Sequence, residues 1–240
     1  MNWLEVDHVY NMDCIDGMDK IESYSVDLVL TDPPYNVDYT NKSKHLANLG
    51  KSRDKQVKRD KSYIGADFPY TQFAFKLKDV MKHNSHLYLW CGDDQMFDWY
   101  PKLKYAGFKF RCLLFWIKNK QTFNLSMAFN YCYKSENCMF WVRGSKKLRK
   151  VGLNNLFKYN CPNNTIHPTQ KPIGLFEELI INSTNEGDLV FDPFMGSGTT
   201  AVACMRTNRH FIGFEISPEY HKIIENRINN EKISPKITSF

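Results

Sequence analysis

The stretch VDLVLTDPPY, residues 26–35, decides the fold of this chain. Its apolar run over residues 26–31 predicts a buried β-strand. Each proline that follows fixes its own φ, restricts the residue before it and lacks an N–H, so the turn leaving the strand is stiff. Ligands of open α/β sheets bind at the carboxyl ends of strands. The candidate catalytic residues are therefore the tetrapeptide Asp32, Pro33, Pro34 and Tyr35.

This tetrapeptide suits the recognition of a planar NH2 group. The Asp32 carboxylate and the Pro33 carbonyl can each accept one N–H, because neither proline supplies a competing donor. The Tyr35 ring can then cover the ring that carries the amino group. The same residues are also consistent with a proline-rich turn that holds a surface aspartate and a packing tyrosine. The rest of the chain has to separate these two interpretations.

A second motif lies near the carboxyl terminus. DLVF, residues 188–191, predicts a strand, and the glycine loop DPFMGSGTT, residues 192–200, opens a helix. The next strand, HFIGFE, ends in Glu215, 17 residues after Gly198. Glycines allow close approach of a ligand, a helix N-terminus binds an anion, and the acid can bind ribose hydroxyls. Ala201 stands where a dinucleotide fingerprint has its third glycine, which favours a smaller nucleoside with a carboxylate, such as S-adenosylmethionine.

The remaining patterns predict an α/β fold with alternating strands and helices. Residues 36–66 and 144–170 lack apolar periodicity and are expected to be irregular. Seven strands are expected, at residues 8–12, 26–31, 86–91, 108–117, 138–142, 188–191 and 210–215. Helices are expected at about 14–20, 70–81, 94–106, 172–184 and 200–207, and from 217 onward.

Length and composition predict a single domain over residues 1–240. Hydrophobic residues make up 42% of the chain, which is enough for a core. No run is long enough to span a membrane, and the first residues lack the pattern of a signal peptide, so a cytoplasmic protein is expected. The seven cysteines are scattered and none lies at CxxC spacing, so we expect reduced thiols and no metal site.

The net charge of +6 is concentrated in two stretches. Residues 41–61 contain eight Lys or Arg against two Asp, and residues 143–150 contain five Lys or Arg and no acid. Either stretch alone is typical of a solvated loop. Two basic stretches around one candidate site favour a polyanionic partner such as nucleic acid.

Taken together, DPPY, HPTQKP at residues 167–172, DPFMGSGTT and FIGFE resemble the β class of DNA amino-methyltransferases, which act on adenine N6 or cytosine N4. The resemblance covers nearly all of the chain except residues 40–66 and about 118–160. It implies a Rossmann-like, S-adenosylmethionine-dependent methyltransferase fold. Such a fold has a mostly parallel seven-stranded sheet, helices on both faces and, here, a circularly permuted motif order.

The resemblance also implies roles for individual residues. Asp32, Pro33, Pro34 and Tyr35 would hold the target amino group of a base that has left the duplex, with Asp32 also bordering the cofactor. Each cofactor residue has an ordinary alternative, such as a helix cap for Asp13, a surface lysine for Lys171 or a core ring for Phe194. The implied cofactor-binding residues are Asp13, Asp32, Lys171, Asp192, Phe194, Gly196, Gly198, Thr199 and Glu215.

The implied partner is double-stranded DNA. A mobile basic loop over about 36–66 would close over the DNA, and a small target-recognition segment over about 118–165 would read it. The expected contacts in the two segments are Lys42, Lys44, Lys51, Arg53, Lys58 and Arg59, followed by Arg143, Lys146, Lys147 and Arg149.

Asp as the first residue of the tetrapeptide favours adenine N6, because enzymes of this family that act on cytosine N4 usually carry Ser there. Cytosine N4, an RNA or protein amide substrate, and a catalytically silent DNA-binding relative stay open as alternatives. The sequence also leaves open a homodimer and a cognate restriction endonuclease as partners. Its Lys-rich, Asn-rich composition is typical of AT-rich bacterial or phage genomes.

Overall fold

A computed structural model of the protein describes residues 3–34, 68–119, 131, 133–162 and 170–233. Several predictions fall outside these residues, namely Tyr35 and the basic loop of about 36–66 with Lys42, Lys44, Lys51, Arg53, Lys58 and Arg59.

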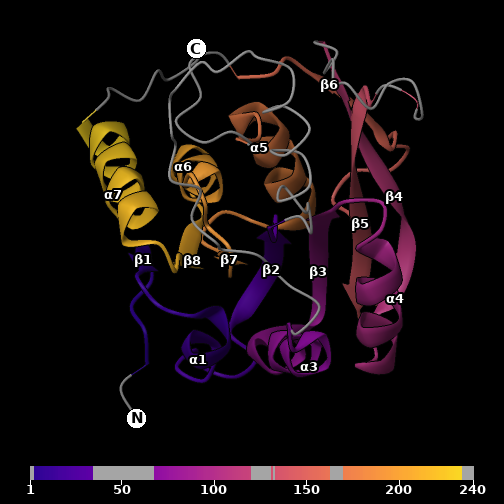
Figure 1. The fold of residues 1–240 in the computed structure, drawn as a ribbon, viewed down its shortest axis with the longest axis horizontal. Coiled ribbons are helices and arrows are strands. Elements are labelled where there is room, and N and C mark those ends of the chain that lie inside the picture. The colour runs from indigo at the N-terminus through magenta and orange to yellow at the C-terminus, as the bar shows by residue number, and fades with distance from the viewer. Residues whose placement is uncertain (1–2, 35–67, 120–130, 132, 163–169, 234–240) are drawn as a thin grey trace, which may run out of the picture.

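The described chain is built on one eight-stranded sheet with the order β1-β8-β7-β2-β3-β5-β4-β6 (Figure 1). Seven strands run in one direction and β5 runs antiparallel to its neighbours β3 and β4. The strands are β1 (His8–Tyr10), β2 (Val26–Thr31), β3 (Met81–Cys91), β4 (Lys109–Lys118), β5 (Ser135–Arg143), β6 (Leu156–Tyr159), β7 (Leu189–Asp192) and β8 (His210–Phe214).

The eighth strand corrects the expectation of seven. β6 lies in a stretch that we expected to be irregular, and it pairs in parallel with the end of β4. The strand has four residues, of which only Phe157 is buried, so its sequence lacks a clear apolar pattern. Its place is fixed by tertiary contacts, including a hydrogen bond of 2.8 Å from the Trp116 indole N–H to the Tyr159 carbonyl.

Helices cover both faces of the sheet, as expected (Figure 1). One face carries α1 (Cys14–Met18), α3 (Tyr70–Val80) and α4 (Met96–Tyr105), and the other carries α5 (Ile173–Ser183), α6 (Thr199–Arg206) and α7 (Pro218–Ile233). All six residues of β2 are buried, because both of its faces are covered. This double burial explains why β2 reads as a continuous apolar run without alternation.

The chain leaves β7 and β2 in opposite directions across the sheet. β7 continues through α6 to β8 on one side, and β2 continues through α3 to β3 on the other. β2 and β7 pair in parallel, with Leu28 opposite Val190 and Val29 opposite Phe191. Their carboxyl ends therefore form a topological switch point, where open α/β sheets bind ligands.

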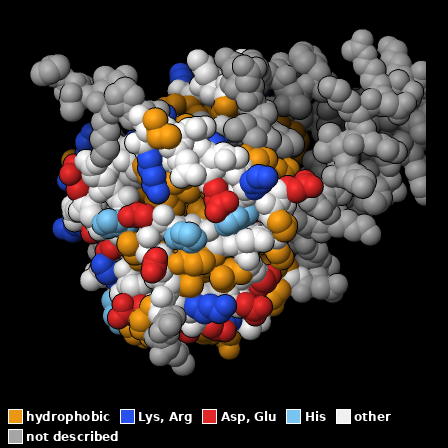
Figure 2. Space-filling model, turned by 90° about the vertical axis from the view of Figure 1, so that its left-hand side faces the viewer, with side chains coloured by type: hydrophobic (Ala, Val, Ile, Leu, Met, Phe, Trp, Pro, Cys, Tyr) orange, Lys and Arg blue, Asp and Glu red, His pale blue; other side chains and the backbone are white. Residues whose placement is uncertain are grey.

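The outer surface on the side of β1 and α7 carries mixed charges (Figure 2). Acidic, basic and histidine side chains are interspersed there. No helix within the described ranges is both long and apolar enough to cross a bilayer.

Candidate active site

The glycine loop connects β7 to α6 at the switch point. Gly196 has φ +55° and Gly198 has φ +80°, a region that favours glycine over other residues. A Cβ on Gly198 would also lie 3.0 Å from the Ile224 side chain. Because α6 begins directly after Gly198, the backbone N–H groups of its first turn are oriented toward the carboxyl edge of the sheet. This edge is suited to bind an anionic group.

Asp192, the last residue of β7, ties this loop to the neighbouring elements. Its Oδ1 accepts from the Thr31 hydroxyl at 2.8 Å and from the Phe194 N–H at 3.0 Å, and its Oδ2 accepts from the Thr200 hydroxyl at 2.5 Å. The side chain is almost completely buried. Asp192 therefore joins the end of β2, the glycine loop and the start of α6 through one carboxylate.

Asp192 also makes the free energy of unfolding depend on pH. Burial, only partly offset by the hydrogen bonds, raises the pKa of Asp192 from 3.8 to about 6. Between these values the folded state holds a proton that the unfolded state has lost, so the stabilising contribution of Asp192 falls as the pH rises from about 4 to 6. The difference corresponds to about 3 kcal/mol.

We expect urea unfolding to detect this dependence when the wild type is compared with Asp192→Asn, which cannot titrate at this position. Across the window from about pH 4 to 6, the wild type should lose up to about 3 kcal/mol relative to the variant. If the curves of unfolding free energy against pH are parallel for the two proteins, the raised pKa of Asp192 is contradicted.

Glu215 follows β8 and reaches the other side of the glycine loop. Its Oε2 accepts from the Gly196 N–H at 2.8 Å, and its Oε1 accepts from the Ser217 N–H at 2.9 Å. Burial raises the pKa of Glu215, and the backbone donors oppose this effect. The Glu215 N–H donates to the Tyr10 carbonyl at 3.1 Å, so the ends of β8 and β1 are joined.

Asp13 lies just beyond β1 and caps α1. Its Oδ1 accepts from the Ile15 N–H at 2.8 Å and from the Asp16 N–H at 3.4 Å. The alternative of a helix cap is therefore present in the structure. It leaves the second carboxylate oxygen of Asp13 for a further partner at the same edge of the sheet.

The Asp32 turn is held from two directions. The Lys171 ammonium donates to Asp32 Oδ2 and, at 3.0 Å, to Glu136 Oε2. On the other side, the Gln95 amide donates to the Pro34 carbonyl at 2.9 Å. The turn therefore has fixed partners in addition to the stiffness of its prolines.

A single cavity brings the two sequence motifs together. Its walls contain Asp32 from the tetrapeptide and Gly196 from the glycine loop, although these residues are far apart in the chain. The cavity is small, about 50 Å³. Within the described residues, the two motifs thus face one cleft. The lining residues are Asp32, Gln170, Lys171, Phe176, Asp192, Phe194, Met195, Gly196, Ser197, Thr199 and Thr200.

Comparison with known proteins identifies the family. The sequence profile N6_N4_Mtase, which describes DNA methylases, matches residues 26–160 and 146–226. This chain belongs to the DNA methylase family. The type II methyltransferase M.HpaI of Haemophilus parainfluenzae is 31% identical to this methylase over 245 residues, covering 90% of this chain and 72% of the relative. The type II methyltransferase M2.MboI of Moraxella bovis is 28% identical over 242 residues, covering 92% and 86%.

Solved structures confirm the predicted fold class. The M1.HpyAVI–SAM complex superposes with a TM-score of 0.68 at 24% identity, covering 92% of this chain and 98% of the other. The cytosine-N4-specific PvuII DNA methyltransferase superposes with a TM-score of 0.69 at 18% identity, covering 99% and 89%. The methylase therefore has the α/β methyltransferase fold of these structures.

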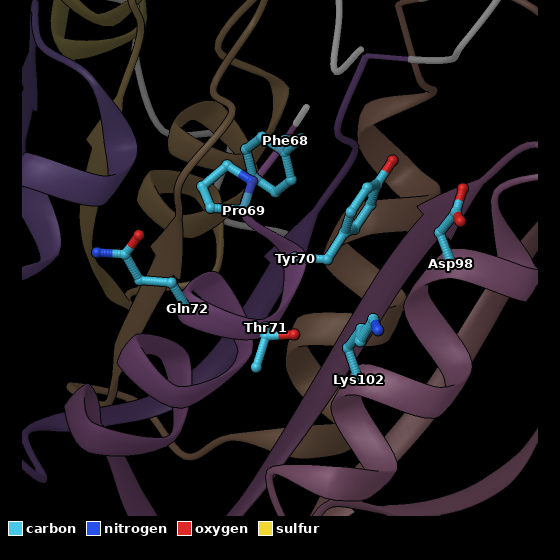
Figure 3. A pocket seen from close by; sticks show the side chains of 7 residues that line it. All are labelled: Phe68, Pro69, Tyr70, Thr71, Gln72, Asp98 and Lys102. Carbon is cyan, nitrogen blue, oxygen red and sulfur yellow. The ribbon is translucent and has the colours of Figure 1, made fainter. Parts of the chain in front are cut away.

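Phe194 lies on the side of the glycine loop that faces α3. Its ring packs on Phe73, with centroids 5.5 Å apart, and lies 6.1 Å from Phe68. Beyond Phe68, a pocket of about 570 Å³ opens between the first turns of α3 and α4 (Figure 3). None of the described motif residues lines this pocket, which is distinct from the cavity beside Asp32. Its walls are Phe68, Pro69, Tyr70, Thr71, Gln72, Asp98 and Lys102.

The basic stretch that follows β5 begins at the amino end of β3, away from the cavity. Because β5 is antiparallel to β3, Arg143 is opposite Ser85, near the beginning of β3, and far from the carboxyl edge that carries the cavity. The buried Arg143 guanidinium donates to the carbonyls of Lys78 and Met81, so the prediction that Arg143 reads DNA is wrong.

The neighbours of Arg143 share this position. Lys146 donates to the Asp27 carbonyl at 3.3 Å, and Arg149 donates to the Thr184 carbonyl at 2.8 Å. Lys147 is exposed in the same segment. The predicted DNA contacts of Lys146, Lys147 and Arg149, unlike that of Arg143, stay a prediction.

Several residues of the site carry no motif and were missed in the sequence. Glu136 is the second residue of β5, and Gln95 precedes α4. Thr31 appears in the sequence only as the last residue of an apolar run. The one available signal was an acid, Glu136, two residues before the apolar run of residues 138–142, and the structure shows it partly buried.

Proposed function

We propose that this methylase transfers a methyl group from S-adenosylmethionine to the N6 amino group of an adenine that has left a DNA duplex. The observation that carries the proposal is the shared cavity, in which the Asp32 carboxylate and the Gly196 loop face one another at the switch point. Membership of the DNA methylase family supports the reaction class.

The residues around the glycine loop fit S-adenosylmethionine. Two left-handed glycines allow its close approach, and the first turn of α6 offers N–H groups to the methionine carboxylate. The Glu215 carboxylate, held between two backbone donors, retains lone pairs for ribose hydroxyls. Asp13 would contact the adenine of the cofactor and Phe194 would shape its seat. When bound, S-adenosylmethionine supplies a sulfonium methyl group.

The Asp32 turn would prepare the target nitrogen. An adenine amino group is a poor nucleophile because its lone pair is delocalised into the ring. Asp32 and the Pro33 carbonyl would each accept one of its N–H groups and favour a tetrahedral nitrogen whose lone pair faces the methyl group. The Asp32 carboxylate would also offset the positive charge that develops on this nitrogen. Catalysis would then consist mostly of positioning and electrostatics.

The base must leave the duplex to reach a cavity at the edge of the sheet. Tyr35, the next residue of the turn, would stack on it. The six basic residues Lys42 to Arg59 named above would contact phosphates, which contributes affinity without sequence selectivity. Similarity to type II methyltransferases supports the further proposal of a cognate restriction endonuclease.

Cytosine N4 is the second candidate target. It is favoured by the structural likeness to the cytosine-N4-specific PvuII enzyme, but that likeness concerns the fold. Asp32 as the first residue of the tetrapeptide favours adenine. A glycine motif that follows the target motif in the chain disfavours an RNA or protein amide substrate.

Nucleoside analysis tests the proposal. DNA incubated with the protein and S-adenosylmethionine is digested and its nucleosides are separated by mass. We expect N6-methyl-2′-deoxyadenosine to appear only when both protein and cofactor are present. N4-methyl-2′-deoxycytidine would support the second candidate, and unmodified DNA with every tested sequence would contradict the reaction.

A further inference from the structure

Four charged side chains of alternating sign form a continuous row that starts at the proposed target site. The Asp32 carboxylate contacts the Lys171 ammonium, which also contacts Glu136 at 3.0 Å. Glu136 in turn pairs with Lys118 on the neighbouring strand β4. Lys171 is buried, with 2% of its side chain exposed, and the Glu136 and Lys118 side chains are each 17% exposed. We name Asp32, Lys171, Glu136 and Lys118 the charge chain.

The ammonium at the second position creates a difficulty for the proposed reaction. Lys171 contacts the carboxylate that has to accept an N–H from the target. An ammonium paired with Asp32 alone would weaken this acceptor and would repel the positive charge that develops on the target nitrogen. In a buried site such charge interactions are stronger than in water. Lys171 therefore needs a second anion if Asp32 is to remain effective.

Glu136 is placed to supply that anion. Burial alone would lower the pKa of Lys171, but the nearby carboxylates of Asp32 and Glu136 raise it overall. Burial alone would likewise raise the pKa of Glu136, but Lys171 and Lys118 lower it overall. Both groups are thus charged at neutral pH. The Lys171 ammonium also lies over the Trp90 ring, 5.4 Å from the ring centroid, in a cation–π contact.

We propose that Glu136 is a positioning residue for methyl transfer: by sharing the Lys171 ammonium with Asp32, it orients the Asp32 carboxylate and prevents Lys171 from neutralising it. This inference rests on the proposed function. It assigns Lys171 to the target side of the cavity, in addition to the cofactor side implied by the resemblance. Lys118 completes the chain by compensating Glu136 at the end away from Asp32.

An ion pair that only stabilises the fold would affect stability but not the rate of methyl transfer. The same sheet offers a comparison at its opposite edge, where Lys82 pairs with the buried Asp27 of β2 at 2.7 Å. Loss of the Glu136 carboxylate or of the Asp27 carboxylate should lower the stability of the protein. Only loss of Glu136 should lower the rate of transfer in the molecules that remain folded.

The test uses single-turnover methylation by the full-length protein, with S-adenosylmethionine and DNA both saturating. We expect Glu136→Gln to reduce the transfer rate about 10- to 100-fold, a range typical for residues that support a reacting group without touching the substrate. The dissociation constant for S-adenosylmethionine, measured by calorimetry, should stay within about 3-fold of wild type, because the glycine loop and Glu215 are unchanged. Asp27→Asn, the matched control, should transfer at the wild-type rate per folded molecule.

Two further variants separate the rate from folding. Glu136→Asp keeps the charge but shortens the side chain, and it should recover part of the rate. In Glu136→Gln, the Lys118 ammonium loses the carboxylate with which it pairs. The double variant Glu136→Gln/Lys118→Gln also removes this unpaired ammonium. Its thermal stability should therefore rise above that of Glu136→Gln, while the rate stays low because Lys171 has still lost the carboxylate that shares its charge.

The outcomes distinguish this inference from the proposed function. Full activity of Glu136→Gln beside an active wild type would overturn the role of Glu136 and leave the methylase assignment intact. A double variant that regains the wild-type rate together with its stability would also overturn it. A wild type that methylates no DNA would refute the proposed function and this role with it.

Discussion

The Asp32→Ala variant should lose methyl transfer by about 1,000-fold or more, because the change removes both an acceptor for the target amino group and the negative charge beside it. The variant should nevertheless fold. The buried Lys171 ammonium loses Asp32 but keeps its second carboxylate partner, Glu136, at 3.0 Å. The Thr31 hydroxyl still donates to Asp192, so the join between β2 and β7 is retained.

The measurement is single-turnover methylation together with calorimetric binding of S-adenosylmethionine. Binding should stay within several-fold of wild type, because the glycine loop is untouched. Asp27→Ala, in the strand that leads to Asp32, is a matched control, since it also removes a buried carboxylate that pairs with a lysine. We expect this control to be less stable but active. Near-normal transfer by Asp32→Ala would end the proposed mechanism.

The second large effect concerns binding of the cofactor. Each oxygen of Glu215 accepts from a backbone N–H, at Gly196 and at Ser217. In Glu215→Gln one oxygen becomes an NH2 group, which faces one of these donors and cannot accept from it. Loss of a hydrogen bond to a charged group, with the proposed loss of a ribose contact, should weaken binding by about 3 kcal/mol, or about 100-fold.

Calorimetric titration with S-adenosylmethionine measures this loss directly. Glu219→Gln is the matched control, because it removes the same charge from an exposed position four residues later. The control should bind as the wild type does. Equal affinities of all three proteins would show that Glu215 takes no part in holding the cofactor.

The two variants also divide the cavity into two halves. Asp32→Ala should change transfer and spare cofactor binding, whereas Glu215→Gln should change cofactor binding first. This pattern is expected only if the Asp32 turn serves the target and the glycine loop serves the cofactor.

Much of the fold could be predicted because the central strands are covered on both faces. That double burial forces apolar runs such as residues 26–31 and 188–191, which are easy to recognise. The sites at the ends of these strands could be predicted for a similar reason. Left-handed glycines and a proline-stiffened turn have few substitutes, so Gly196, Gly198 and the Asp32 turn stand out in the sequence.

The errors arose where tertiary contacts decide the outcome. The direction of β5 determines which end of that strand faces the cavity, and local sequence does not encode this direction. Because β5 is antiparallel, its first residues bring Glu136 to the site and its last residues carry Arg143 away from it. The sequence therefore did not show that Arg143 is buried or that Glu136 lies beside Lys171.

The most direct test of the central claim is a crystal structure of the protein with S-adenosylmethionine bound. The claim is that the Asp32 turn and the glycine loop act on one methyl group. The cofactor should lie along residues 194–199 with its sulfonium methyl directed at the space beside the Asp32 carboxylate, leaving a nitrogen at that place about 3 to 3.5 Å from the methyl carbon. A cofactor bound elsewhere, or a methyl group directed away from Asp32, would contradict the account.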